Sequence, residues 1–163
     1  QDLARTLEEM VKSGKVGAVG VSNFTHGHIA ALKSALDIPL VSTQPEFSAL
    51  HLDPLEQGLL DQAMEHGMAV LAWSPLGGGR IAQPGTDRER AVAAALDTVA
   101  QEFGVSRTAA AYSWIMAHPA RAIPIVGSQP VSRIREAGDA LKVRWTRQAW
   151  YDVLVASRGE KLP

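Results

Sequence analysis

The sequence lacks several features that would assign a function class at once. It has no cysteine among its 163 residues, which excludes disulfide bonds and thiolate metal sites and fits a reducing, cytoplasmic compartment. Neither sign of charge dominates, because 16 basic and 17 acidic residues give a formal net charge of −1. This balance favours neither nucleic acid nor a membrane as a partner. No apolar run approaches the roughly 20 residues of a membrane-spanning helix, and no signal peptide is visible.

What is present is the composition of one ordinary globular domain, which we expect to span residues 1–163. Hydrophobic residues make up 46% of the chain and charged residues 20%, both typical values. A domain of this length buries roughly 70% of its unfolded surface. No linker or low-complexity tract divides the sequence. The chain starts at Gln1, inside a helical pattern, so we expect it to be a fragment.

Periodicity predicts helices and strands in alternation. The predicted helices span residues 2–13, 26–37, 53–66, 86–103, 106–118, 133–140 and 146–157. The predicted strands span residues 16–21, 40–44, 68–73 and 122–127. The predicted N-caps are Asp53, Thr86, Ser106 and Thr146, with capping boxes completed by Glu56 and Glu89. This alternation is typical of an α/β fold with a parallel sheet, either a small open sheet or part of a (β/α)8 barrel.

Polar or aromatic residues follow each of the predicted strands. They are Ser22 and Asn23, then Gln44, then Trp73 and Ser74 with the loop to Arg80, and last Gly127, Ser128, Gln129 and Arg133. Both folds gather ligand sites at the C-terminal ends of their strands, so we expect these residues on one rim. Amide side chains suit a carboxamide, an aromatic ring can stack on a flat ring, and a glycine-rich loop with an arginine suits phosphate. Together they predict a dinucleotide site.

Each feature also has an ordinary structural explanation. Ser22 and Asn23 fit a turn or a helix cap, Trp73 fits a core position, and the glycine run fits a flexible loop. Arg133 fits a solvated helix position. The five histidines show no spacing typical of a metal site, so no bound metal is expected. It is the coincidence of placement, and no single motif, that favours a functional interpretation.

Four segments closely resemble the aldo-keto reductases in order along the chain. They are GVSNF (20–24), TQPEFSAL (43–50), LAWSPLGGGRI (71–81) and IPIVGSQPVSRIREA (123–137). The AWSPLGGGR form and the closing TRQAW segment resemble a bacterial subgroup of that family. The resemblance implies a (β/α)8 barrel that binds NADPH in an extended pose. It also implies that the four strands here are strands five to eight, the C-terminal half of the barrel.

The resemblance implies a role for individual residues. Ser22, Asn23 and Gln44 match positions that hydrogen-bond the nicotinamide carboxamide, and Trp73 matches the aromatic residue stacked on the ring. The loop positions around the pyrophosphate are matched by Ser74, Leu76, Gly77 and Arg80. The positions around the adenosine 2′-phosphate are matched by Gly127, Ser128, Gln129 and Arg133, and Glu136 matches an acidic residue near the adenine. An arginine at this place favours NADPH over NADH, because guanidinium pairs well with phosphate.

Two departures from the family pattern bear on function. Ala137 stands where many members carry Asn, which affects adenine recognition. The family's catalytic Asp, Tyr, Lys and His belong to the first half of the barrel and match no residue here. Carbonyl reduction needs a general acid beside the developing alkoxide. We therefore expect residues 1–163 alone to reduce no substrate, although the full-length enzyme would act on a small carbonyl compound.

Two alternatives differ from this prediction in kind. One is a non-catalytic half-barrel that binds a nucleotide or a partner protein. A half-barrel exposes two sheet edges, so self-pairing of the chain would be expected. The other is a phosphate-binding α/β domain unrelated to the reductases. It would be favoured if Ser22, Asn23, Gln44 and Trp73 did not come together in the fold.

Overall fold

The computed structural model describes residues 2–160. Its centre is a sheet of four parallel strands, β1 (Val19–Ser22), β2 (Leu40–Gln44), β3 (Ala69–Ala72) and β4 (Ile123–Pro124), in the spatial order β1-β2-β3-β4. Each strand therefore pairs with its successor in the chain. At the C-terminal ends Ser22 pairs with Gln44, and Ala72 pairs with Pro124.

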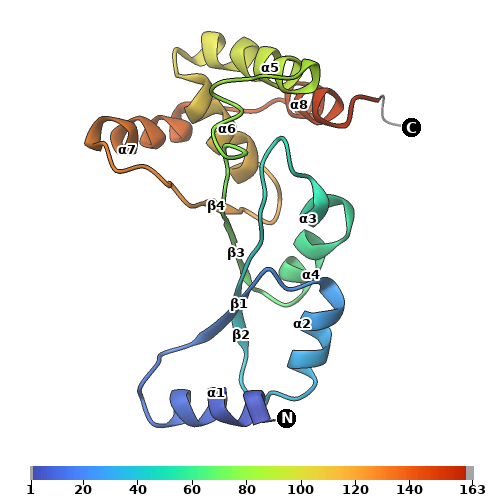
Figure 1. Ribbon diagram of the computed structural model, residues 1–163, viewed down its shortest axis with the longest axis vertical. Coiled ribbons are helices and arrows are strands. Elements are labelled where there is room, and N and C mark those ends of the chain that lie inside the picture. The colour runs from blue at the N-terminus through green and yellow to red at the C-terminus, as the bar shows by residue number, and fades with distance from the viewer. Residues whose placement is uncertain (1, 161–163) are drawn as a thin grey trace.

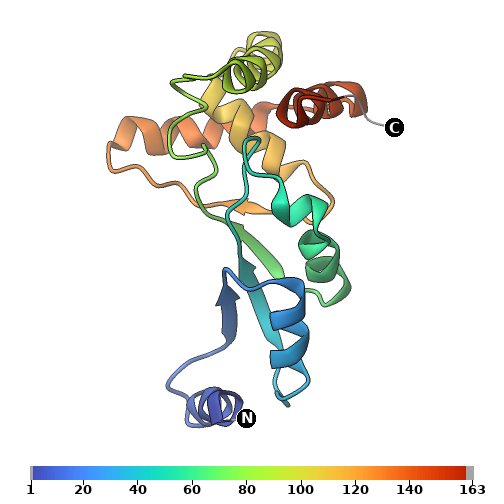
Figure 2. The same ribbon diagram turned by 45° about the vertical axis from the view of Figure 1, so that its right-hand side comes forward.

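Helices and loops connect the strands (Figure 1). The helices are α1 (Asp2–Lys12), α2 (His26–Lys33), α3 (Asp53–Glu56), α4 (Leu59–Glu65), α5 (Asp87–Phe103), α6 (Arg107–Met116), α7 (Val131–Ala137), the 3-10 helix η1 (Gly138–Lys142) and α8 (Arg147–Arg158). Helices α5 to α8 gather around one end of the sheet, and α1 lies beyond the other (Figures 1 and 2). Within residues 2–160 none of these helices has the length and apolarity to cross a membrane.

Only one face of the sheet is covered. Val70 and Ala72 are buried in the main apolar cluster, and Val19 and Val21 pack against it. The residues that alternate with these face the other way: Gly20, Ala69 and Ile123 are exposed. Figures 1 and 2 show helices α2 to α4 on one side of β1 to β3 and no element against the other. A sheet that is covered on one face leaves its second face open to solvent or to another segment.

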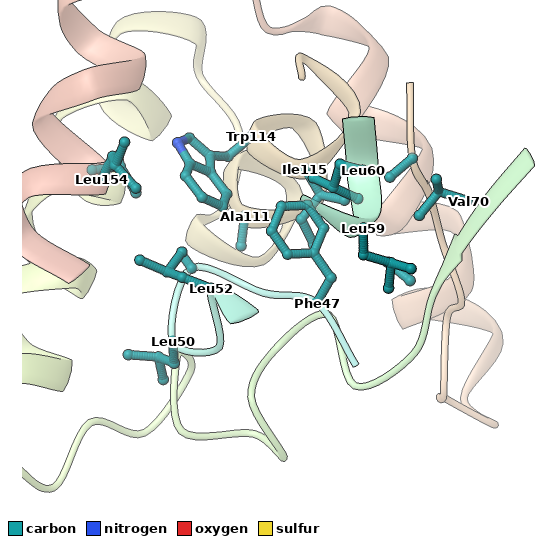
Figure 3. Close-up of a cluster of buried hydrophobic side chains, with 14 of the residues drawn as sticks. Phe47, Leu50, Leu52, Leu59, Leu60, Val70, Ala111, Trp114, Ile115 and Leu154 are labelled. Carbon is teal, nitrogen blue, oxygen red and sulfur yellow. The ribbon is translucent and has the colours of Figure 1, made fainter. Parts of the chain in front are cut away.

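The covered face belongs to a continuous apolar core. Phe47, Leu60, Trp114 and Ile115 are the largest of the labelled side chains that are fully buried there (Figure 3). Trp114 stacks on Trp150 with ring centroids 4.9 Å apart and an interplanar angle of 11°. The two indole N–H groups donate to each other's backbone carbonyls at 3.0 Å. These paired bonds join α6 to α8 in one fixed arrangement.

Several predicted boundaries are confirmed. Strand β2 occupies residues 40–44. Thr86 and Glu89 form a complete capping box at α5, and Gly104 ends that helix in a left-handed conformation. Ser106 and Thr146 cap α6 and α8 with their hydroxyl groups. Caps depend on residues only three apart, so the sequence alone suffices to place them.

The predicted helix over residues 53–66 is wrong. The chain forms two short helices there, because Gly58 takes a left-handed φ of 77° between them. Asp53 is the first helical residue and no cap, since Leu52 holds the N-cap position without a side-chain hydrogen bond. The predicted capping box with Glu56 is therefore absent. Pro54 does lie in the first turn, as predicted.

The outer strands and the first helix also differ from the predictions. The first strand begins at Val19 instead of residue 16 and is an edge strand, half exposed instead of buried. The last strand has two residues instead of six. In α1 the apolar residues at helical spacing are largely uncovered, with Leu3 57% and Met10 37% exposed. Strands β1 and β4 are the two outer strands of the sheet and each pairs on one side only, and α1 lies beyond the end of the sheet (Figure 1).

Candidate functional site

The site begins where β1 and β2 end side by side. The Ser22 hydroxyl and the Asn23 backbone N–H both donate to the Gln44 carbonyl, each at 3.1 Å. Asn23 then leaves the strand with a φ of 56°, in the left-handed region. Asparagine tolerates that region better than most residues. The sequence Ser-Asn thus ends the strand and fixes both side chains at the rim.

Trp73 brings the third strand to the same place. Its indole N–H donates to Asn23 Oδ1 at 2.7 Å. Its backbone is held by Pro45, whose carbonyl accepts from Trp73 N–H at 3.0 Å, and by Phe47, whose N–H donates to the Trp73 carbonyl at 3.2 Å. Four residues predicted from separate segments therefore form one cluster: Ser22, Asn23, Gln44 and Trp73.

The hydrogen bonds of this cluster determine what it can offer a ligand. Asn23 accepts the Trp73 proton on Oδ1, so its amide N–H groups are left to donate. The Ser22 hydroxyl donates its hydrogen bond to the Gln44 carbonyl, so its oxygen can still accept one from a ligand. The side-chain amide of Gln44, half buried, has no partner within residues 2–160 and can do either. A donor beside an acceptor complements a carboxamide, which presents one of each.

A cavity of about 350 Å³ opens beside this cluster. Asn23 and Trp73 line it together with Phe24, Pro45 and Glu46, and no lysine or arginine contributes to its wall. A wall that carries two carboxylates, Glu46 and Asp53, and neither lysine nor arginine does not suit phosphate. It suits the uncharged amide end of a ligand.

The glycine-rich loop after β3 is tightly folded on itself. Ser74 has a left-handed φ of 50°, and its carbonyl and hydroxyl accept from the N–H groups of Gly77 and Gly78 at 2.8 and 3.0 Å. Gly79 N–H donates to Leu76 at 3.1 Å. Gly77 has a left-handed φ of 59°, which favours glycine, and it packs closely on Leu50, whose Cδ1 would lie 3.0 Å from a Cβ at this position. The glycine N–H groups are thus used within the loop, contrary to the expectation that they would face a phosphate.

Arg80 turns from this loop toward the start of α5. Its Nε donates to the Gly77 carbonyl at 2.7 Å, and its Nη1 lies 3.6 Å from Glu89 Oε1. Glu89 accepts from the N–H groups of Gly85 and Thr86 at 2.7 and 3.1 Å. These two backbone hydrogen bonds, assisted by Arg80, hold the pKa of Glu89 below its ordinary value of 4.5. The carboxylate therefore fastens the loop to α5.

We expect Glu89→Gln to reduce the amount of stability that the protein loses as the pH falls from 7 to 3. A lowered folded-state pKa means that the stabilisation is present above the unfolded-state pKa and is lost as pH falls through the folded value. The variant should unfold at lower urea concentration than the parent at pH 7 and approach it below about pH 4.5. Urea midpoints between pH 7 and pH 3 measure this. Glu102→Gln, on the exposed side of the same helix, is the control. A difference in urea midpoint between Glu89→Gln and the parent that stays the same at every pH would contradict the prediction.

Sequence reasoning missed a second anchor of the loop. The Arg107 guanidinium pairs through two nitrogens with both carboxylate oxygens of Asp97 and donates to the Ile81 carbonyl at 3.2 Å. Asp97 raises the pKa of Arg107 by this pairing. The ion pair joins α5, α6 and the end of the loop. Its partners are ten residues apart on different helices, a spacing with no local sequence signal.

The segment after β4 holds the remaining predicted residues. The Ser128 hydroxyl oxygen is buried and has no hydrogen-bond partner among residues 2–160. Arg133 is exposed on α7 and forms no ion pair within residues 2–160. Glu136 lies near Tyr112, whose pKa is raised by burial first and by the Glu136 charge second. A buried hydroxyl without a partner and an unpaired guanidinium are groups that an anion would satisfy.

The predicted residues thus form three groups rather than one continuous cleft. In the part of the chain that the structure describes, no hydrogen bond or ion pair joins residues 74–80 to residues 127–136. No group of three or more histidine, aspartate or glutamate side chains there is placed to hold a metal ion. The three groups follow successive strands at one end of the sheet, which is the arrangement an extended ligand needs.

Comparison with known proteins identifies relatives over nearly the whole chain. A model described as "Aldo/keto reductase family" matches residues 1–153. A 6-dehydroglucose reductase of Novosphingobium aromaticivorans is 62% identical over 99% of this chain and 53% of its own length. A second protein of that name, from Agrobacterium fabrum, is 39% identical over 99% of this chain and 54% of its own. The chain spans about half the length of the curated relatives it matches.

Solved structures show the same fold at lower identity. A thermostable aldo-keto reductase is 23% identical with a TM-score of 0.80, covering 94% of this chain and 53% of that one. An aldose reductase of Giardia lamblia is 21% identical with a TM-score of 0.81, covering 99% and 52%. The four parallel strands and their helices therefore match about half of a (β/α)8 barrel.

Proposed function

Because the chain belongs to the aldo/keto reductase family, we propose that residues 1–163 are a single domain, the cofactor-holding C-terminal half of an NADPH-dependent carbonyl reductase. The hydrogen bond from Trp73 to Asn23 carries the proposal. It joins two segments of the family pattern and leaves Asn23 as a donor beside the acceptor Ser22. This pair, with Gln44, would hold the carboxamide of a nicotinamide ring, and the Trp73 indole would pack against that ring.

The segment after β4 would hold the other end of the cofactor. Ser128 supplies a buried hydroxyl that lacks a partner, and Arg133 supplies a guanidinium without an ion pair. Both suit the 2′-phosphate that distinguishes NADPH from NADH. Gly127 and Gln129 border the phosphate in this arrangement, and Glu136 lies toward the adenine.

Between these ends, residues 74–80 would face the pyrophosphate. The glycine N–H groups of the loop are engaged with Ser74 and Leu76. We therefore assign the pyrophosphate contact to the Arg80 side chain, which is 55% exposed. Leu76 and Gly77 shape the turn that presents it.

Bound NADPH would supply a hydride to the carbonyl carbon of a substrate. The carbonyl oxygen must then gain a proton from a general acid. Tyr112 does not suit this role, because it is buried in α6 and its pKa is raised. We place the acid in the part of the whole protein that corresponds to the other half of the relatives.

The test is NADPH oxidation by the whole protein that contains these residues, with 6-dehydroglucose as the first substrate because two relatives are named for its reduction. We expect Asn23→Gly to raise the Kd for NADPH about tenfold, the effect of losing one hydrogen bond of about 1.4 kcal/mol. Glycine keeps the left-handed backbone, so the loss reports the Asn23 side chain, that is, its donor group and its hydrogen bond with Trp73.

Two controls accompany this measurement. Asn23→Ala should bind NADPH as weakly as Asn23→Gly but unfold earlier, because alanine is strained at a φ of 56°. Residues 1–163 alone should oxidise no NADPH. Unchanged NADPH affinity in Asn23→Gly, or turnover by residues 1–163 alone, would contradict the proposal.

The uncovered sheet face favours a second candidate function, a half-barrel that pairs with another copy. Ile123 of β4 is 53% exposed and Val41 of β2 is 42% exposed, and both would be buried by a partner. Light scattering distinguishes the candidates. A stable dimer of residues 1–163 that binds NADPH without turnover would favour pairing.

A further inference from the structure

A second cavity, of about 520 Å³, lies in the layer of helices away from the proposed cofactor site. It opens between α3, the end of α6 and α8, and no residue of the proposed site lines it. Its wall contains Leu55, Pro119, Trp145, Trp150, Tyr151 and Leu154, with the polar groups His118, Arg147, Glu56 and Arg158. Its volume falls within the range of small-molecule sites.

The aromatic wall is rigid and presents apolar surface. Trp145 donates its indole N–H to Ser113 Oγ at 3.0 Å, and Trp150 donates its own to the Trp114 carbonyl at 3.0 Å. Trp150 is also stacked on Trp114. Because both indole N–H groups have partners, the cavity meets ring faces and edges instead of donors. Such a wall favours a flat, apolar ligand.

His118 offers one donor without a partner. Its side chain lines the cavity although the residue is only 9% exposed. Its Nδ1 accepts from the Ala120 N–H at 3.1 Å, so in the neutral ring the proton is on Nε2. Burial lowers the pKa of His118, against a smaller opposing effect of Asp61, and favours that neutral ring. The Nε2–H has no hydrogen-bond partner within residues 2–160.

The cavity also holds one positive charge that no carboxylate offsets. Arg158 lies 3.4 Å from Glu56 and 3.5 Å from Glu160, so its charge is matched. Arg147 lies over the Tyr151 ring, 5.6 Å from its centroid, and forms no ion pair in the described part of the chain. Among the charged side chains that line the cavity, Arg147 is thus the one without an ion pair in the described residues, and it can pair with an anionic group.

We propose that this cavity binds a small aromatic monocarboxylate. The ring of the ligand packs on Trp145 and Trp150, and its carboxylate pairs with the Arg147 guanidinium. The Tyr151 ring that Arg147 covers lies with its centroid 5.3 Å from that of the Trp150 ring. A carboxylate attached to a ring that packs on Trp150 therefore lies on the side of the cavity where the guanidinium is.

The probe is 1-naphthoate, titrated into the whole protein and followed by tryptophan fluorescence. We expect 1-naphthoate to bind at least tenfold more tightly than the neutral 1-naphthamide, because charge-assisted hydrogen bonds are the stronger kind. Arg147→Met keeps the apolar stem and should remove this difference. Arg144→Met, an exposed arginine outside the cavity, is the matched control and should preserve it.

Three results would overturn the proposal. They are equal affinity for 1-naphthoate and 1-naphthamide, no binding at millimolar concentration, and 1-naphthoate binding that Arg147→Met leaves unchanged. The last result would mean that the probe binds elsewhere. If Arg147→Met does not fold, the comparison of the two probes on the parent protein decides. The NADPH affinity of Arg147→Met should equal that of the parent, because no proposed cofactor residue lines the cavity.

Discussion

Replacing Trp114 with alanine should lower the free energy of unfolding by about 3–5 kcal/mol, the range for large aromatic residues in protein cores. Trp114 is fully buried, packs near Phe47 and stacks on Trp150. Its removal would open a cavity and also leave the Trp150 carbonyl without its indole donor. The urea midpoint measures the loss, provided the slope of the transition is unchanged.

Two variants show whether the loss comes from packing at this position. Trp114→Phe keeps a ring in the stack but removes the donor, so it should cost less than Trp114→Ala. Leu141→Ala removes a side chain that is 67% exposed and should change stability by less than about 0.5 kcal/mol. A Trp114→Ala variant as stable as Leu141→Ala would mean that α6 and α8 do not pack as described.

Replacing Arg133 with glutamine should weaken NADPH binding roughly 10–100-fold and leave NADH binding nearly unchanged. The expected range follows from the 1.5–3 kcal/mol of a hydrogen bond to a charged group. Arg133 is exposed on α7 and has no ion-pair partner within residues 2–160, so its loss should not disturb the fold. Fluorescence titration of the whole protein with each cofactor measures the two affinities.

Arg135 provides the matched control for this experiment. It lies two residues along the same helix and is also exposed. Arg135→Gln removes the same charge and should keep the preference for NADPH. If both variants lose affinity equally, α7 attracts the cofactor through its overall charge and Arg133 has no specific role. If neither variant loses affinity for NADPH, the assignment of Arg133 to the 2′-phosphate is wrong.

Sequence patterns predicted the features that depend on near neighbours. The capping box of Thr86 and Glu89 and the hydroxyl caps of α6 and α8 each involve residues three apart, and all are present. The alternation of strands and helices predicted a parallel sheet, and the structure has one. The segments GVSNF and LAWSPLGGGRI resembled the family that the comparisons then identified.

Local patterns failed where a single residue or a missing neighbour decided the outcome. Gly58 divides the predicted helix over 53–66, although helical spacing of apolar residues continues through it. Leu3 and Met10 follow the pattern of a buried helix face and yet are exposed. Periodicity reports which residues share a face, but burial requires another element to cover that face.

The sequence by itself therefore determined the fold class and the residues available at each strand end. Only the tertiary structure decided how they combine. The Trp73–Asn23 hydrogen bond spans 50 residues, and the Arg107–Asp97 pair joins two helices. The same holds for the glycine loop, whose amides bond within it and leave Arg80 as its exposed donor. Hydrogen-bond partners are chosen in three dimensions, because each donor pairs with whatever acceptor the packed chain brings within reach.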